Sequence, residues 1–238
     1  MRMLPLAVAA AALGVFAAAT DSQAGDGNVI HIKQESPAGS LVGNSLSIDQ
    51  SKADDSLVAG PSVPALLPYL GLSLDSAASG SLRPALQRGE GNVATVTMTG
   101  PDGNEGAGGT LLLLQDTSRG GTLQLPNSGT SNEAIVRMQG AALGAVIQMG
   151  TGNTANLELD NSRGLIGQFG TRLTANLNVA EGGNGQIVQV GSGSTATLTV
   201  PEGASATYVQ AGNGLATTGV QIITATNPGM ITINQTAW

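Results

Sequence analysis

The chain contains no cysteine, a single histidine and few aromatic residues, which make up only 2% of its 238 residues. Without cysteine it has neither a disulfide framework nor a lipid-anchored cysteine, and one histidine provides no transition-metal cluster. That histidine, His31, stands between Ile30 and Ile32 in a run of alternating character, so we expect it to face outward from a strand. These absences favour a protein that is not an enzyme and that uses no cofactor.

Charge is also scarce. Charged residues make up 11% of the chain and the net charge is −7, which excludes the basic face that nucleic-acid binding requires. Disordered chains combine high charge with little hydrophobicity, whereas this chain is 41% hydrophobic and contains 35 glycines. The composition therefore predicts short strands joined by turns of small residues.

The first residues have the pattern of a secretory signal peptide. Arg2 is followed by an apolar stretch over 4–19, and Ser22 and Ala24 provide the small residues of a cleavage site. We therefore expect residues 1–24 to be removed. No other stretch approaches the length of a membrane span, so the expected location is extracellular or on a bacterial cell surface.

A repeat with a period of 20–21 residues is the strongest positive signal. Glutamine recurs at 148, 168, 189 and 210, and each copy carries glycine two residues later. Self-similarity at such a period is typical of solenoids. The predicted structural residues are Gln87, Gln148, Gln168, Gln189 and Gln210, with Gly89, Gly150, Gly170, Gly191, Gly212, Asn92 and Asn153.

The repeat predicts an all-β fold, a β-solenoid with about two strands per 20–21-residue coil. Paired strands lie about 4.8 Å apart, so equivalent glutamines of successive coils would lie above one another. Their amides would then hydrogen-bond from coil to coil, as stacked Gln and Asn side chains do in cross-β assemblies. Glycine two residues later would make room where the backbone bends.

Around this repeat the chain divides into further segments. Residues 25–51 contain two alternating strands, and 52–86 contain four prolines that indicate an irregular insertion or linker. Solenoid repeats occupy 87–216. Residues 217–238 are predicted to form a hairpin or cap, because a turn signal at 227–229 separates two strand-like runs.

The two strands of a repeat differ on their outward sides. The second strand is polar there, whereas the first carries a largely apolar row that we call the candidate contact face. A strand that is apolar on both sides is usually buried on both sides. The cover would be residues 52–86, another copy of the chain or a partner. This face consists of Ile147, Met149, Phe169, Val188, Val190 and Val209.

The pattern Gln-x-Gly-x-x-Asn-x-Ala, best preserved from Gln87 and from Gln148, resembles the curlin repeat of curli-type fibres. The resemblance covers residues 28–51 and 87–215 in broken form. It implies a two-strand-per-coil β-solenoid that polymerises end to end into extracellular biofilm fibres. The implied role is structural or adhesive, and the implied partner is the chain itself or a related curlin-like subunit.

Departures from the curlin pattern keep other functions open. The second glutamine of that repeat is replaced by an aliphatic residue or methionine, and the proline-bearing insertion is unlike a minimal fibre subunit. One alternative is a non-polymerising accessory protein, such as a nucleator, a cap, a holdfast-type anchor or a polysaccharide-binding surface protein. A third is an ice-binding solenoid, suggested by Thr-x-Thr-x-Thr runs at 95–99 and 195–199.

Overall fold

The computed structural model describes residues 26–36, 42–61, 83–117, 131–215, 220–221 and 230–236. The predicted signal peptide and much of the proline-bearing segment lie outside these residues. Within them the protein consists of β-strands and one short 3-10 turn, η2 (Pro101–Gly103). The all-β prediction is confirmed, and all the strand pairs are parallel.

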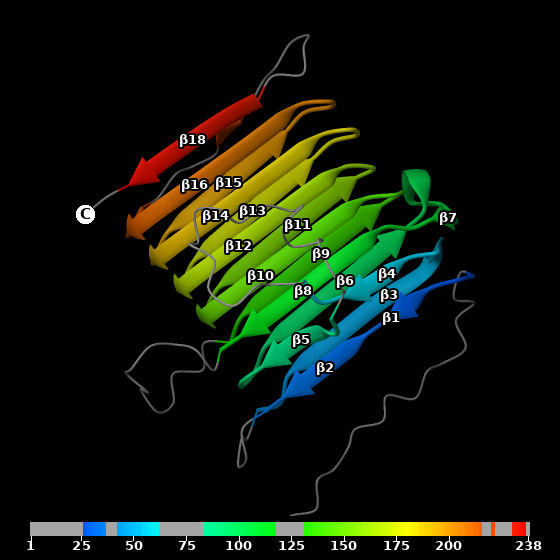
Figure 1. Ribbon diagram of the computed structural model, residues 1–238, viewed down its shortest axis with the longest axis horizontal. Coiled ribbons are helices and arrows are strands. Elements are labelled where there is room, and N and C mark those ends of the chain that lie inside the picture. The colour runs from blue at the N-terminus through cyan, green and yellow to red at the C-terminus, as the bar shows by residue number, and fades with distance from the viewer. Residues whose placement is uncertain are drawn as a thin grey trace, which may run out of the picture.

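The strands form two sheets, which Figure 1 shows one behind the other, stacked in chain order from blue to red. The first sheet contains β1 (Val29–Ile30), β2 (Ile32–Glu35), β4 (Leu57–Ala59), β5 (Ala85–Arg88), β8 (Thr110–Asp116), β10 (Leu143–Thr151), β12 (Arg163–Thr171), β14 (Asn184–Ser192), β16 (Ser205–Asn213) and β18 (Met230–Thr236). The second contains β3 (Ser45–Asp54), β6 (Val93–Thr99), β7 (Gly106–Ala107), β9 (Glu133–Gln139), β11 (Thr154–Asp160), β13 (Thr174–Val179), β15 (Thr195–Val200) and β17 (Val220–Gln221).

From β8 to β18 the chain alternates between the two sheets, and each strand pairs with the strand two elements later. We call each strand level of a sheet a rung. Gln148 pairs with Gln168, and Gln168 with Gln189, so the offset between rungs equals the repeat period of the sequence. Identical or similar residues therefore lie in columns through the stack.

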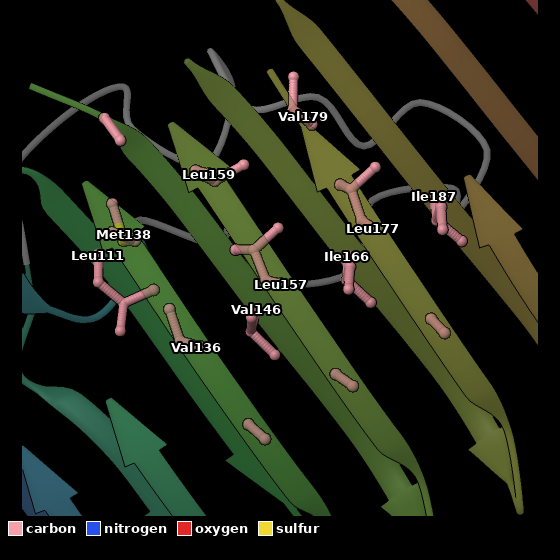
Figure 2. Close-up of a cluster of buried hydrophobic side chains, with 14 of the residues drawn as sticks. Leu111, Val136, Met138, Val146, Leu157, Leu159, Ile166, Leu177, Val179 and Ile187 are labelled. Atoms are coloured by element: carbon pink, nitrogen blue, oxygen red, sulfur yellow. The ribbon is translucent and has the colours of Figure 1, made fainter. Parts of the chain in front are cut away.

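The core lies between the two sheets and consists of small and aliphatic side chains. Val146 and Ile166 of the first sheet face Leu157 and Leu177 of the second, and all four are fully buried. Figure 2 shows these side chains pointing into the space between the sheets. Alternation along each strand places every second residue in this layer, which explains why a chain with 2% aromatic residues still forms a continuous core.

The boundaries predicted for the insertion are wrong. Residues 52–54 belong to β3, and β4 and β5 both pair with β8, so together they form a single rung. The isolated bridge between Gly60 and Arg83 joins the two points where the chain leaves this rung and returns. The proline-bearing segment thus interrupts one rung instead of preceding the repeats, which cannot be seen from spacing alone because β4 and β5 are distant in sequence.

The predicted C-terminal hairpin is also wrong. β17 pairs in parallel with β15 in the second sheet, whereas β18 pairs in parallel with β16 in the first. The two strands therefore continue the alternation between sheets and do not pair with each other. The residues of β18 continue the preceding columns, with Gln235 beside Gln210 and Ile233 beside Tyr208.

Candidate functional site

A column of glutamines, buried everywhere except at its two ends, runs through the stack of described strands. Gln87, Gln148, Gln168, Gln189 and Gln210, the five predicted positions, all lie in it and are at most 1% exposed. The side-chain Nε2 of each donates to the Oε1 of the glutamine on the next rung. The donor–acceptor distances are 2.9 Å from Gln148 to Gln168, 2.9 Å from Gln168 to Gln189 and 2.8 Å from Gln189 to Gln210.

Three further glutamines of the column were not predicted. Gln34 donates to Gln87 over 2.6 Å, Gln87 to Gln115 over 2.7 Å, and Gln115 to Gln148 over 2.8 Å. At the other end, Gln210 donates to Gln235 over 3.3 Å. Neither Gln115 nor Gln235 has the glycine two residues later that marks the repeat. The shared signal is a glutamine that directly follows or closes a strand-like run rich in aliphatic residues.

Buried glutamines of the column also connect the two sheets. Besides the next amide, Gln148 Nε2 donates to the backbone carbonyl of Glu133 (2.9 Å), and Gln168 Nε2 to that of Thr154 (3.0 Å). A buried amide that lacks partners costs free energy, whereas these amides have both a neighbour in the column and a carbonyl across the core. The column therefore stabilises the stacking of rungs and the spacing of the sheets together.

The glycines two residues after the glutamines lie where the strand ends and the backbone turns. Gly150, Gly170, Gly191 and Gly212 all have positive φ, between +113° and +145°, a conformation that glycine adopts at little cost. They stack on one another so closely that a Cβ on Gly170 would collide with the carbonyl oxygen of Gly191. Gly89 also has a positive φ, of +99°.

The asparagines of the repeat form hydrogen bonds with the backbone of this turn. Asn153 is fully buried, and its Nδ2 donates to the carbonyl of Gly170 (3.1 Å) while its Oδ1 accepts from the backbone N–H of Leu173 (3.1 Å). Asn132, which was not among the predicted residues, binds Gly150 in the same way (3.0 Å). Asn92 lies one rung earlier, and within the described part of the chain its buried Oδ1 accepts no bond, while its Nδ2 donates to Arg88 O.

The candidate contact face forms one apolar cluster on the outer side of the first sheet. Ile147 and Val188 are each 1% exposed, and Met149, Phe169, Val190 and Val209 are half-buried against them. The cluster also contains Ala59, Leu112, Ala145 and Leu165, with Leu57, Leu114 and Leu143 packed against them. Of the residues 52–86 that were predicted as one possible cover of the face, those from 62 to 82 lie outside the described residues.

We expect Phe169→Asp to destabilise the protein by about 2–3 kcal/mol, because the change removes apolar burial and places a carboxylate beside aliphatic side chains. Thermal unfolding followed by circular dichroism measures this loss. The matched control is Thr174→Asp, at an exposed position of β13, which should shift the melting temperature little. Equal melting of both variants would show that the first sheet needs no apolar outer face.

Charged residues gather at the N-terminal end of the first sheet. Glu35 forms ion pairs with Lys33 and Arg88, each at 2.6 Å, and Arg88 lies 3.8 Å from the buried carboxylate of Asp116. Hydrogen bonds from Lys33 and Arg88 hold the pKa of the partly exposed Glu35 carboxyl below its usual value. The favourable pairing is therefore complete above the usual glutamate pKa and is lost as the pH falls through the lowered one.

Other motifs do not gather into a reactive site. His31 is exposed at the edge between β1 and β2, and Asp102 to Glu105 form the turn around η2. In the described part of the chain, no three His, Cys, Asp or Glu side chains are close enough to hold a metal ion. No helix in that same part could cross a membrane. The threonine column Thr154–Thr174–Thr195 has neighbours of mixed type, with Glu158 beside Asn178 and Asn178 beside Thr199.

Comparison of the chain with protein-family models, with curated proteins and with solved structures found no match. The function is therefore argued from the columns of the core, from the outer face of the first sheet and from the two ends of the stack.

Proposed function

We propose that the protein is a curlin-like β-solenoid, with about two strands per coil, that serves as a structural or adhesive component of an extracellular fibre or biofilm matrix. It would be secreted, act at the bacterial cell surface or beyond it, and use no catalytic site. Its partner would be the chain itself or a related curlin-like subunit. Assembly would proceed by addition of one end strand to another.

The alternation of strands between two parallel sheets supports the solenoid part of this proposal. Each strand pairs with its counterpart one repeat away, and Leu157, Leu177 and Leu198 follow one another in one column of the second sheet. Such columns are what successive coils of similar sequence produce. A stack of this kind grows without changing its internal contacts, which suits a fibre.

The proposal that the protein self-assembles rests on the end strands of the first sheet, which have unpaired edges. Among the strands that the structure describes, β1 and β2 at one end of the first sheet, and β18 at the other, each pair with a strand on one side only, as Figure 1 shows. An unpaired strand edge is a template for another chain. At the N-terminal end, Val29, Ile30 and Ile32 are 43–46% exposed, so this edge also presents apolar surface.

The proposal predicts that the chain expected after signal removal, residues 25–238, forms thin unbranched fibres at neutral pH within about a day. Negative-stain electron microscopy tests this, with preformed fibres added as seeds in a parallel sample. Seeding should remove the lag before assembly, because an existing end provides the template. Particles that stay monodisperse even when seeded would contradict self-assembly.

A non-polymerising accessory role, as a nucleator, a cap, an anchor or a polysaccharide binder, is the second candidate. The charged cluster of Lys33, Glu35 and Arg88 at the N-terminal edge favours it, because charges on edge strands commonly prevent unwanted pairing. Under this alternative Lys33→Thr with Glu35→Thr would allow fibres that the unchanged chain does not form.

A further inference from the structure

The glutamine column has a direction. From Gln34 to Gln210, every Nε2 donates towards the C-terminal end of the stack, and from Gln87 to Gln235 every Oε1 accepts from the N-terminal side. The assignment of oxygen and nitrogen follows from chemistry, since Nε2 also meets backbone carbonyls that can only accept. Examples are Ser45 O at 3.0 Å from Gln87 and Glu133 O at 2.9 Å from Gln148.

This direction leaves a different atom at each end. In the described part of the chain, Oε1 of Gln34 accepts no hydrogen bond and Nε2 of Gln235 donates none, although the opposite atom of each amide is bonded within the column. One end of the stack thus presents an amide acceptor and the other an amide donor.

The end strands also share a pattern. The N-terminal edge reads Ile30-His-Ile32-Lys-Gln34, and the C-terminal strand reads Ile231-Thr-Ile233-Asn-Gln235. Both glutamines lie in the same column, and both pairs of isoleucines occupy core columns. Ile30 pairs with Val58, Ile32 with Ala85, and Ile233 with Tyr208, each of which is buried in the core.

We infer that a second copy of this chain stacks its β1–β2 edge on β18 in one specific register, with Gln235 Nε2 donating to Gln34 Oε1. Ile233 then lies beside Ile32, and Ile231 beside Ile30. The inference rests on the proposed self-assembly and adds its polarity and register. It continues both the amide column and the core columns from one copy into the next.

The opposite arrangements are less favourable for three reasons. Joining two N-terminal ends would bring Oε1 against Oε1, and joining two C-terminal ends would bring Nε2 against Nε2. Either joint would also be antiparallel in a molecule whose strand pairs are parallel. Finally, the outward residues of β18 are the uncharged Thr232, Asn234 and Thr236, so they oppose Lys33 and Glu35 without like-charge repulsion.

The second sheet shows where such a fibre would be weakest. In the first sheet β1 with β2 and β4 with β5 share rungs, so its ten strands make eight rungs. In the second sheet β6 and β7 share a rung, because both pair with β3, so its eight strands make seven rungs. In the described part no strand of the second sheet therefore lies opposite β18. The junction has one continuous sheet, and the other is interrupted for one rung.

Cysteine pairs test the register directly, because the chain has no cysteine of its own. The matched pair is Lys33→Cys with Asn234→Cys, whose sites would be neighbours about 4.8 Å apart across the junction, within the Cα separation of a disulfide. The shifted pair is Lys33→Cys with Thr232→Cys, about 8 Å apart, which is beyond that range. Both carry the same change at Lys33 and are checked for fibres under reducing conditions.

After mild oxidation of the assembled protein, we expect the matched pair to give a ladder of covalent multimers on non-reducing gels. The shifted pair should give at most a tenth as much. Fibres in which the shifted pair reacts as well as the matched pair, or in which neither reacts, would overturn the inferred register and leave the proposed function standing. Failure of the unchanged chain to assemble at all would overturn both.

A mixing experiment tests polarity without cysteine. Ile32→Lys blocks the N-terminal end and Ile233→Lys the C-terminal end, so neither variant should form fibres alone. Their equimolar mixture should form dimers by sedimentation, because each retains one competent end and the two are complementary. Dimers of either variant alone would overturn the inference, since they require like ends to join. Melting of each variant, compared with the unchanged chain, establishes that it is folded.

Discussion

Gly170→Ala is expected to destabilise the protein by more than about 4 kcal/mol, the range of the most damaging single substitutions. Gly170 has φ of +145°, and a Cβ there would overlap the carbonyl oxygen of Gly191 on the next rung. That atom belongs to the backbone of a paired strand, so it cannot move away without breaking the ladder between β12 and β14. Thermal unfolding should show a loss of on the order of 10 °C or more.

Gly193→Ala provides the matched control. Gly193 lies on the adjacent turn with φ of +62°, and a Cβ there would meet no atom within 4 Å. We expect this substitution to lower the free energy of unfolding by about 1–2 kcal/mol, the cost of placing a Cβ on a left-handed backbone. If the two variants melt within about 1 kcal/mol of each other, the glycine column does not need its close stacking, and backbone conformation alone explains the recurrence of glycine.

Gln168→Ala is the second large effect, at about 3–5 kcal/mol. The change leaves Gln189 Oε1 and the carbonyl of Thr154 without their donor in the core, and each unsatisfied buried group costs about 1–3 kcal/mol. Gln168 is fully buried, so the truncation also leaves a cavity. Denaturant unfolding measures the loss as a change in midpoint at constant slope.

Two further variants separate the amide from its volume. Gln168→Met keeps most of the side-chain volume but removes the hydrogen bonds, and should lose about 2–3 kcal/mol. Asn176→Ala removes an amide from the exposed side of β13 and should change stability by less than about 0.5 kcal/mol. A Gln168→Met variant as stable as the unchanged chain would mean that the column stabilises the protein through packing and not through hydrogen bonds.

The regular part of the fold was predictable because one circuit of the chain has nearly constant length there. Between Gln148 and Gln210 the glutamines recur after 20 or 21 residues, so spacing in the sequence becomes spacing in the column. Apolar residues also alternate with polar ones along the second strand of a repeat, and the structure buries them, as it does Ala155, Leu157 and Leu159. Period and alternation are local properties, so they can be recognised in the sequence without knowledge of the fold.

The irregular rungs were not predictable in this way. Gln87 and Gln115 are 28 residues apart, Gln115 and Gln148 are 33, and Gln34 and Gln87 are 53, yet the donor–acceptor distances between them are 2.6–2.8 Å. Stacking depends on where a strand returns to the sheet and not on how many residues the loop contains. Spacing therefore excluded Gln34 and Gln115. At the C-terminus the turn signal at 227–229 predicted a hairpin, whereas β17 and β18 belong to different sheets.

The sequence by itself determined that this protein is built of β-strands, that glutamine, glycine and asparagine recur at fixed places, and that one outer row is apolar. These properties depend on residue type and short-range order. Only the tertiary structure decided which distant strands share a rung, that eight glutamines form one directed column, and which amide atom lies at each end. Those features depend on hydrogen bonds between residues far apart in the chain, whose partners and direction are fixed only when the two sheets pack together.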